Sequence, residues 1–418
     1  MSKAGLTQHI LGTAFVTCCA FWYLRVTVWK VIPELDARPS DYRAYYDASR
    51  NVLAGRSPYT DVNYIYPPLA ALLNTPLALL DYVPARRIWF VLSQGMLLIA
   101  AWLMWRISGR SWPAACWIAL VWAAGGSAGE SLALGQLGPL LTLVVVMAST
   151  GAPRRMGTAI GLGFALKIIP AILLPALVLG RNRRAMRAAA IAVAAGLGVP
   201  WILVAFGLRG PSSPSGSATW TGTAATLSWS VPSVVLRALD PPATGTELPR
   251  SWQVGADLPN VQLPLRLRLA SVAVILVILA GGVAAFAMAV RGRLSREQMP
   301  VAVTALIALG LAASPVCWTH YEVMQYPGVA LMLCAAWRPR RWGLLAAALV
   351  LGACLYPLPV AILRDYYTRH SGWTAASPAT LYLWTSVTPA ASLVLFGLLT
   401  REARRMGTHA VEKPVSTR

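Results

Sequence analysis

The residues best suited to chemistry lie in a polar segment, residues 36–76, between two apolar stretches of the 418-residue chain. The segment is rich in aspartates, tyrosines and arginines. Carboxylates that stand beside a bilayer surface usually serve a function. Asp41 is therefore the first candidate for catalysis, because a positioned carboxylate can act as a general base that takes the proton of a hydroxyl group.

The residues from Ser40 to Gly55 predict a short helix along the membrane surface. Ser40 is suited to the N-cap position, and Gly55 is suited to end the helix. Asp41 and Tyr45 share one face by their spacing of four residues. Asp47 lies nearly half a turn away, so we expect no paired-carboxylate site. A solvated amphipathic loop helix is the alternative interpretation of this segment.

Three further groups of polar residues interrupt apolar stretches. Lys167 lies deep in one of them, where a lysine is costly unless it pairs with an anion or reaches a cavity. Pro170 follows it and is expected to loosen the helix. His320 and Tyr321 lie in a connection between two apolar segments, where a lone histidine is also commonly structural. Gln136 belongs to a polar break that alone favours a bend.

The composition predicts an all-α polytopic membrane protein of about twelve transmembrane helices. The chain is 57% hydrophobic and 12% charged, about half the charged fraction of soluble domains. The net charge of +21 fits basic loops that set orientation or contact anionic lipid, and no motif indicates a nucleic-acid partner. The six cysteines show neither metal-ligand spacing nor a disulfide framework, so we expect no metal and no cofactor.

Twelve apolar segments are expected to span the membrane, several of them shorter than a full crossing requires. They are 6–26, 67–82, 88–105, 112–125, 136–150, 157–180, 186–207, 266–290, 299–315, 322–337, 341–363 and 380–400.

Compact basic turns then predict the orientation, because such turns favour the cytoplasmic side. Five groups fall on one side together with both termini: Arg86-Arg87, Arg181/Arg183/Arg184/Arg187, Arg291/Arg293/Arg296, Arg338/Arg340/Arg341 and Arg401/Arg404/Arg405. Arg154-Arg155 falls on the other side. A re-entrant segment near 126–138 would remove this conflict.

We expect a single integral-membrane domain over residues 1–418. Its first external loop, 27–66, would be the catalytic loop. A second long external loop, 208–265, is rich in Pro, Gly, Ser and Thr, and residues 401–418 would form a cytoplasmic tail. The two halves show no internal repeat of the kind common in transporters.

Four sequence patches follow one another between about residues 36 and 325. They are DYRAYYDASRNVLAGRSPYTDVNYIYPPLAALL, LALGQLGPLLTL, ALKIIPAILL with the downstream RNRR, and SPVCWTHY. Together they resemble glycosyltransferase family 87, the polyprenyl-phosphate-mannose-dependent mannosyltransferases of the C-type glycosyltransferase superfamily. Among its members, the actinobacterial enzymes that extend phosphatidylinositol mannosides are similar.

The resemblance implies a membrane glycosyltransferase with its active site on the external face of the cytoplasmic membrane. A sugar, most probably mannose in this family, would pass from a polyprenyl phosphate to a lipid-linked or envelope glycan acceptor. Asp41 matches the superfamily's general base, and single displacement with inversion would give an α-linkage. Lys167 and a protonated His320 would stabilise the departing phosphate. The expected substrate-binding residues are Tyr45, Tyr66, Gln136, Lys167, His320 and Tyr321.

Two departures from the family pattern bear on the acceptor and the sugar. The family often has a second histidine where this chain has Tyr321, and TLSWSVPSVVLR replaces an asparagine-glutamine-serine stretch of the large outer loop. A transporter or flippase of a lipid-linked or small-molecule substrate is the first alternative. An envelope glycan polymerase or ligase with a diphosphate-linked donor is the second.

Overall fold

The structure, a computed structural model, describes residues 3–37, 40–61, 63–213, 228–240, 263–337, 339–355, 358 and 378–411. Over these residues the elements are helical, apart from two isolated β-bridges. Five helices are long and apolar enough to cross a membrane, and five apolar helices are shorter. The predicted all-α polytopic class is confirmed.

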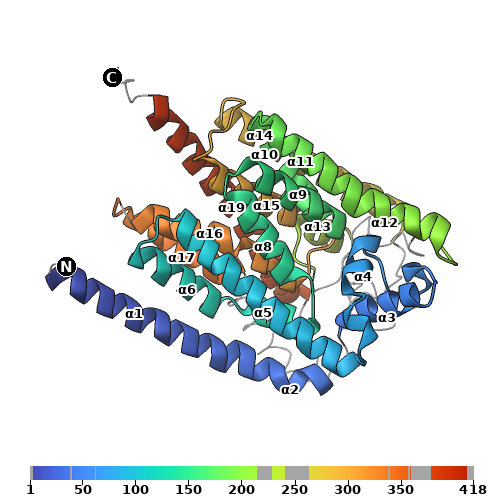
Figure 1. The fold of residues 1–418 in the computed structure, drawn as a ribbon. Coiled ribbons are helices and arrows are strands. Elements are labelled where there is room, and N and C mark those ends of the chain that lie inside the picture. The colour runs from blue at the N-terminus through green and yellow to red at the C-terminus, as the bar shows by residue number, and fades with distance from the viewer. Residues whose placement is uncertain are drawn as a thin grey trace.

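The helices follow in chain order along the bundle in Figure 1. They are α1 (Lys3–Tyr23), α2 (Trp29–Ala37), α3 (Tyr42–Leu53), α4 (Pro68–Asn74), α5 (Tyr82–Ile107), α6 (Trp112–Ala124), α7 (Gly126–Leu134), α8 (Gly138–Ser149), α9 (Pro153–Leu166), α10 (Leu174–Leu179), α11 (Arg183–Val193), α12 (Val199–Ile202), α13 (Val231–Leu239), α14 (Leu265–Ala289), α15 (Met299–Ala313), α16 (Tyr326–Trp337), α17 (Trp342–Leu355) and α19 (Pro378–Val411). The π-helical segment Leu24–Val28 joins α1 to α2, so the chain is helical from Lys3 to Ala37. The expected loop 27–66 therefore contains the end of this helix.

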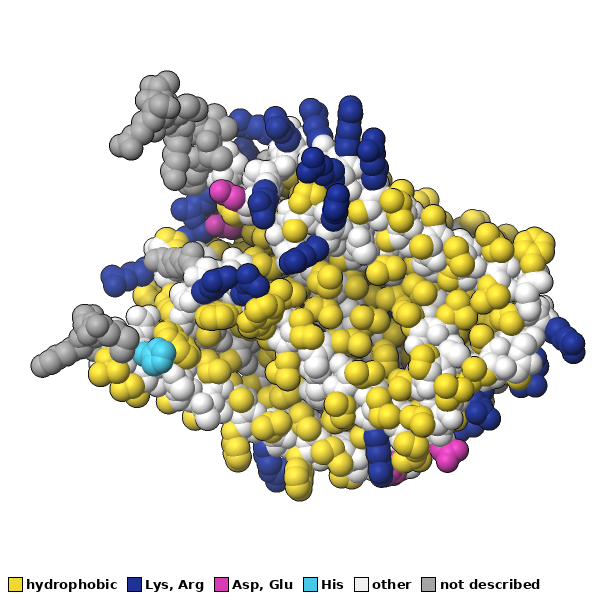
Figure 2. Space-filling view, viewed as in Figure 1, with side chains coloured by type: hydrophobic (Ala, Val, Ile, Leu, Met, Phe, Trp, Pro, Cys, Tyr) yellow, Lys and Arg dark blue, Asp and Glu magenta, His cyan; other side chains and the backbone are white. Residues whose placement is uncertain are grey.

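Contacts between distant segments define two ends of the bundle. At one end, called here the site end, Ser40 Oγ donates to the carbonyl oxygen of Leu134, and Ser57 N donates to that of Arg209. At the other, called the basic end, Leu294 N donates to the Leu179 carbonyl oxygen. Figure 2 shows basic side chains gathered over the starts of α10, α11 and α14, above a broad hydrophobic band.

The segment 67–82 does not cross the bundle, which corrects one expected span. The α4 helix has seven residues, about 10 Å at the α-helical rise. Pro76 follows it closely and a 3₁₀ turn leads to α5. Arg86, near the start of α5, donates to the carbonyl oxygens of Leu35 and Ala133. Both ends of 67–82 therefore lie at the site end.

The expected span 157–180 is a hairpin, which is a second correction. The α9 helix runs parallel to α11, because Gly157 lies against Ala185 and Gly161 against Ala189. The chain then breaks at Lys167, whose backbone is extended (φ −158°, ψ 143°). A 3₁₀ segment that contains Pro170 and α10 bring it back to the basic end. The hairpin thus enters and leaves at the same end of the bundle.

These two corrections remove the conflict in the basic turns. Arg154-Arg155 precede α9 at the basic end, together with the arginines around residue 184 that precede α11. Arg86-Arg87 instead lie at the site end, where Arg87 pairs with Asp36 at 2.5 Å. The segment 126–138 contains α7, which lies at the site end between α6 and α8. The agreement therefore comes from 67–82 rather than from a re-entrant 126–138.

Small residues allow the hairpin to pack closely against α11. A Cβ at Gly157 would lie 2.0 Å from the carbonyl oxygen of Ala185, and one at Gly161 would lie 2.6 Å from that of Ala189. Glycine at such positions lets helix backbones approach in the manner common to membrane bundles. Further along, α19 continues to Val411, and Gln298 Nε2 donates to the Ala403 carbonyl oxygen at 2.6 Å. The expected tail 401–418 therefore begins as part of this packed helix.

Candidate active site

The α3 helix places Asp41 at the start of the catalytic-loop candidate. The helix begins at Tyr42 with Asp41 at the capping position, one residue later than the predicted N-cap Ser40. The Ser40 hydroxyl still accepts from the Tyr42 amide at 3.1 Å. Gly55, at φ +70°, follows the helix end as predicted. Asp47 lies away from Asp41 and pairs with Arg43 at 2.7 Å, so the expected absence of a paired-carboxylate site in α3 is confirmed.

Gln136 joins Asp41 to Tyr45. Its Nε2 donates to Asp41 Oδ2, and its Oε1 accepts from the Tyr45 hydroxyl at 3.1 Å. The turn between α7 and α8 holds this amide in place, because Gln136 N donates to the Ser131 carbonyl oxygen at 2.9 Å. Gly135 has φ +67°, and a Cβ there would lie 2.6 Å from the Cβ of Tyr42. The polar break therefore brings a buried amide against α3.

Two tyrosines enclose the ammonium group of Lys167. Its Nζ lies 3.7 Å from the ring centroid of Tyr321 and 4.9 Å from that of Tyr66. The Tyr45 ring packs against Tyr66 with centroids 4.8 Å apart. Aromatic faces attract a cation, so the cage holds a buried lysine that lacks a salt bridge among the described residues. The extended break after α9 brings Lys167 there.

The connection after α15 supplies the last predicted residues. His320 and Tyr321 belong to the 3₁₀ segment Thr319–Gln325, with their ring centroids 4.5 Å apart and nearly perpendicular. The His320 side chain is buried, and in the described part of the chain its Nε2 has no hydrogen-bond partner. A polar atom of this kind is available to a ligand.

The electrostatics of the site differ between the acid and the histidine. Asp41 retains exposed surface, yet protein atoms crowd its carboxyl group, and this desolvation raises the pKa of Asp41 against the opposing effects of Gln136 and the Lys167 charge. Burial, with a smaller effect of the Lys167 charge, lowers the pKa of His320 well below its ordinary value. The imidazole is therefore neutral, and the expectation of a protonated His320 is wrong.

All seven predicted site residues come together from separate segments of the chain. Asp41 and Tyr45 come from α3, Tyr66 precedes α4, Gln136 precedes α8, Lys167 follows α9, and His320 and Tyr321 precede α16. The contacts described above link six of them into a chain from Asp41 to His320 through Tyr45, Tyr66, Lys167 and Tyr321, and Gln136 closes it beside Asp41.

The sequence analysis missed supporting residues around the histidine segment. Glu322 is buried, accepts from Gln325 Nε2, and lies 3.5 Å from the Cys317 sulfur. Ser228, from the second long loop, accepts from the Cys317 amide at 3.2 Å, and Trp229 N donates to the Cys317 carbonyl oxygen at 2.6 Å. The polar Ser-Trp-Ser run within TLSWSVPSVVLR was the available signal, because small hydroxyl side chains suit buried backbone contacts.

Acidic and sulfur ligands are sparse at the site. Among the described residues, no group of three or more His, Cys, Asp or Glu side chains has a geometry that could hold a metal ion. The charged groups that the structure brings together are one carboxylate and one ammonium. They suit proton transfer and the stabilisation of an anion.

Comparison with known proteins identifies the family. The sequence model of glycosyltransferase family 87 matches residues 64–315. The chain belongs to glycosyltransferase family 87. The matched part of this family-87 chain contains Tyr66, Gln136 and Lys167, while Asp41 and His320 lie just outside it. The protein is therefore a membrane glycosyltransferase.

Relatives of this family-87 chain cover nearly its whole length. A polyprenol-phosphate-mannose-dependent alpha-(1-2)-phosphatidylinositol mannoside mannosyltransferase of Mycobacterium tuberculosis is 25% identical over 92% of this chain and 91% of that protein. A protein of the same description from Mycolicibacterium smegmatis is 26% identical over 93% and 90%. The crystal structure of ArnT from Cupriavidus metallidurans in the apo state aligns with 14% identity and a TM-score of 0.38, over 98% of this chain and 79% of that one.

Proposed function

We propose that this protein transfers mannose from a polyprenyl-phosphate carrier to a lipid-linked or cell-envelope glycan acceptor. Membership of family 87 supports glycosyl transfer. The names of the two mycobacterial relatives, which describe polyprenol-phosphate-mannose as donor and phosphatidylinositol mannoside as acceptor, support the two substrates. The observation that carries the proposal is the convergence of one carboxylate, one caged ammonium and a neutral histidine at the site end.

Asp41 is the proposed general base. Its carboxylate takes the proton of the acceptor hydroxyl as that oxygen forms a bond to C1 of the sugar. The raised pKa of Asp41 suits this role, because a stronger base accepts the proton more readily. Gln136 fixes the direction of the carboxylate by donating to Oδ2 and is itself held by Tyr45.

Lys167 is the proposed partner of the leaving group. The bond between C1 and the phosphate oxygen breaks with its electron pair on that oxygen, so negative charge grows on the lipid phosphate. A fixed cation that faces this charge lowers the barrier. Tyr66 and Tyr321 hold the ammonium without neutralising it, since a ring face carries no net charge. His320 offers its free Nε2 to the donor as a neutral hydrogen-bonding group.

The reaction is a single displacement in this proposal. One carboxylate lies at the site and the described residues place no second acid beside Asp41 as a nucleophile. The acceptor oxygen therefore attacks C1 directly and the configuration inverts. An α-linked product follows from a β-linked donor, as the family resemblance implies.

The site end faces the outside of the cytoplasmic membrane in this proposal. Compact arginine turns favour the cytoplasm, and those around residues 110, 154, 184, 293 and 340 lie at the basic end. Maleimide labelling of single-cysteine variants in intact cells tests this orientation. Arg87→Cys should react with an impermeant reagent, and Arg154→Cys should react only after permeabilisation. The reverse pattern would place the site in the cytoplasm.

The direct test of function uses membranes that contain the full chain and radiolabelled polyprenyl-phosphate mannose. We expect the label to appear covalently in a lipid-linked glycan, and Asp41→Asn to abolish this transfer while leaving protein levels unchanged. Movement of intact donor across the membrane without a labelled product would instead indicate a transporter. Competition by polyprenyl diphosphate oligosaccharides, but not by monophosphate sugars, would indicate a polymerase or ligase.

A further inference from the structure

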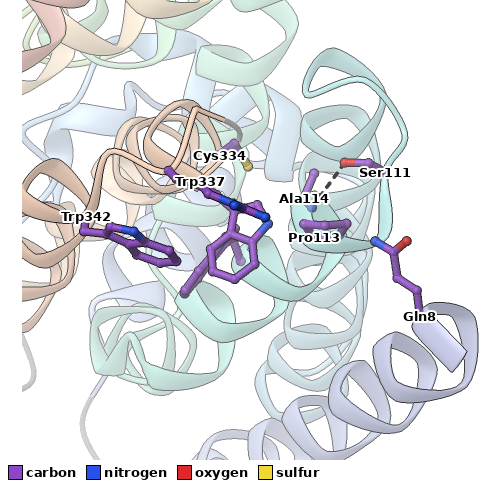
Figure 3. Close-up of a pocket in the computed structure, with 9 residues that line it drawn as sticks. Gln8, Ser111, Pro113, Ala114, Cys334, Trp337 and Trp342 are labelled. Atoms are coloured by element: carbon purple, nitrogen blue, oxygen red, sulfur yellow. Dashed lines mark hydrogen bonds between the residues drawn. The ribbon is translucent and has the colours of Figure 1, made fainter. Parts of the chain in front are cut away.

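A pocket at the basic end lies far from the catalytic residues. It has a volume of about 340 Å³ and is bounded by α1, the start of α6 and the turn between α16 and α17. Figure 3 shows the first turn of α6 between Gln8 of α1 and the indoles of Trp337 and Trp342. Residues of α1 near Gln8 are at the opposite end of that helix from Leu35, which contacts Arg86 at the site end. The pocket therefore opens at the other membrane boundary.

Three indole rings form one wall of this pocket. The ring centroids of Trp117 and Trp337 are 5.6 Å apart, and those of Trp337 and Trp342 are 5.8 Å apart and perpendicular. Trp337 and Trp342 are both exposed. Tryptophan prefers the level of lipid headgroups, where its ring meets the acyl region and its N–H meets polar groups. The wall thus marks the pocket as an interfacial one.

A cation stands at the mouth of the pocket without an acidic partner. Arg340 is exposed, and no described carboxylate lies within ion-pair distance of it. Its neighbour Arg341 is different, because Arg341 NH1 pairs with Glu402 at 2.8 Å. Arg340 also has φ +53°, and its amide donates to the Trp337 carbonyl oxygen at 3.1 Å. This turn holds the free guanidinium beside the indoles.

We propose that this pocket binds the headgroup of an anionic phospholipid, with Arg340 on the phosphate and the three tryptophans around the glycerol and upper acyl region. Charge and position select this occupant. The pocket lies at the basic end of the hydrophobic band, where basic pockets between membrane helices bind anionic headgroups. Ser111 and Gln8 add polar groups to its lining. The site does not depend on the proposed reaction.

Native mass spectrometry of the delipidated full-length protein tests this assignment. Phosphatidylglycerol and phosphatidylcholine with identical acyl chains are titrated separately. We expect one phosphatidylglycerol molecule to bind more tightly than any phosphatidylcholine. Arg340→Gln should weaken that binding about fivefold, the effect of one basic residue near an anionic surface. Arg184→Gln, which removes another exposed basic-end arginine outside the pocket, should leave the tight binding unchanged.

Three outcomes would overturn the proposal. Equal affinities for the two phospholipids would show that the pocket does not select charge, and this comparison needs no variant. Equal weakening by Arg340→Gln and Arg184→Gln would assign the effect to the overall surface charge. Soluble glycerol phosphate that binds as tightly as phosphatidylglycerol would assign the pocket to a free phosphate compound. A thermal melt of each variant confirms that the bundle remains folded.

Discussion

The two ends of the bundle use charge in opposite ways. At the basic end, exposed arginines such as Arg184 and Arg293 lie on short turns and are abundant. At the site end, Asp41 and Lys167 are few, and each is held by neutral side chains, Gln136 in one case and Tyr321 in the other.

The difference separates orientation from chemistry. Charges on exposed turns interact with water and lipid headgroups, and each can be replaced at little cost to the fold. Charges surrounded by amide and aromatic groups lose much of their hydration, so they persist only where neighbours hold them. The positive net charge of the chain therefore reports on the basic end and hardly at all on the reaction.

Replacement of Asp41 should give the largest contrast between acids. Asp41→Asn should reduce mannosyl transfer at least a hundredfold, since a positioned base contributes roughly 10²–10⁴. Asp47→Asn, which removes an exposed acid of the same helix, should leave transfer near the original rate. Initial rates with purified protein measure both. The free energy of unfolding should not fall in Asp41→Asn, because asparagine still accepts from Gln136. Comparable activity of the two variants would remove Asp41 as the base.

Lysine replacements sharpen the same comparison for cations. Lys167→Ala should raise the apparent KM for the polyprenyl-phosphate donor roughly 10- to 100-fold, the range expected for loss of a charge-assisted hydrogen bond. Lys30→Ala, an exposed lysine of α2, serves as the matched control and should change it little. Donor titrations at saturating acceptor make the measurement. An unchanged donor KM in Lys167→Ala would place the ammonium away from the phosphate.

The two glutamines test positioning at opposite ends. Gln136→Ala removes one hydrogen bond to Asp41 and one to Tyr45 and should lower kcat about tenfold, at about 1 kcal/mol for a typical hydrogen bond. The donor KM should stay within about twofold, because Gln136 contacts the base rather than the caged lysine. Gln8→Ala, at the basic-end pocket, should leave kcat unchanged. Equal losses in both variants would indicate a general effect on the bundle.

The pH dependence of transfer should show the smallest effect. Transfer needs the ionised form of Asp41, and burial raises its pKa, so activity should fall on acidification at a pH above the ordinary aspartate value of 3.8. The Lys167 charge opposes this rise. In Lys167→Ala the acidic limb should therefore move to higher pH. Profiles of kcat/KM measure both limbs, and a limb that moves to lower pH would contradict the contact between the two groups.

Local sequence patterns predicted the site well because each candidate is an exception to its surroundings. Lys167 in an apolar run and Asp41 beside one could be found from the letters alone. The cage around Lys167 could not, since Tyr66 and Tyr321 are separated by most of the chain and meet only through tertiary packing. The neutral state of His320 likewise depends on burial that no local pattern reports.

The topology was harder to predict for a similar reason. An apolar stretch such as 157–180 satisfies the length criterion for a span whether it crosses or turns back. The break at Lys167 and Pro170 was visible, but its direction is set by Gly157 and Gly161, which lay α9 against α11. Residues 67–82 failed for the opposite reason, because Pro76 ends α4 after too few turns.

The one-sided hairpin has a consequence for biogenesis. Both of its flanks are strongly basic, with Arg154-Arg155 before it and the arginines around residue 184 after it. A conventional span would require the insertion machinery to translocate one of these clusters. The hairpin avoids that transfer, and its tip delivers a single ammonium, that of Lys167, into the bilayer. The enzyme thereby installs its catalytic cation from the side on which it was synthesised.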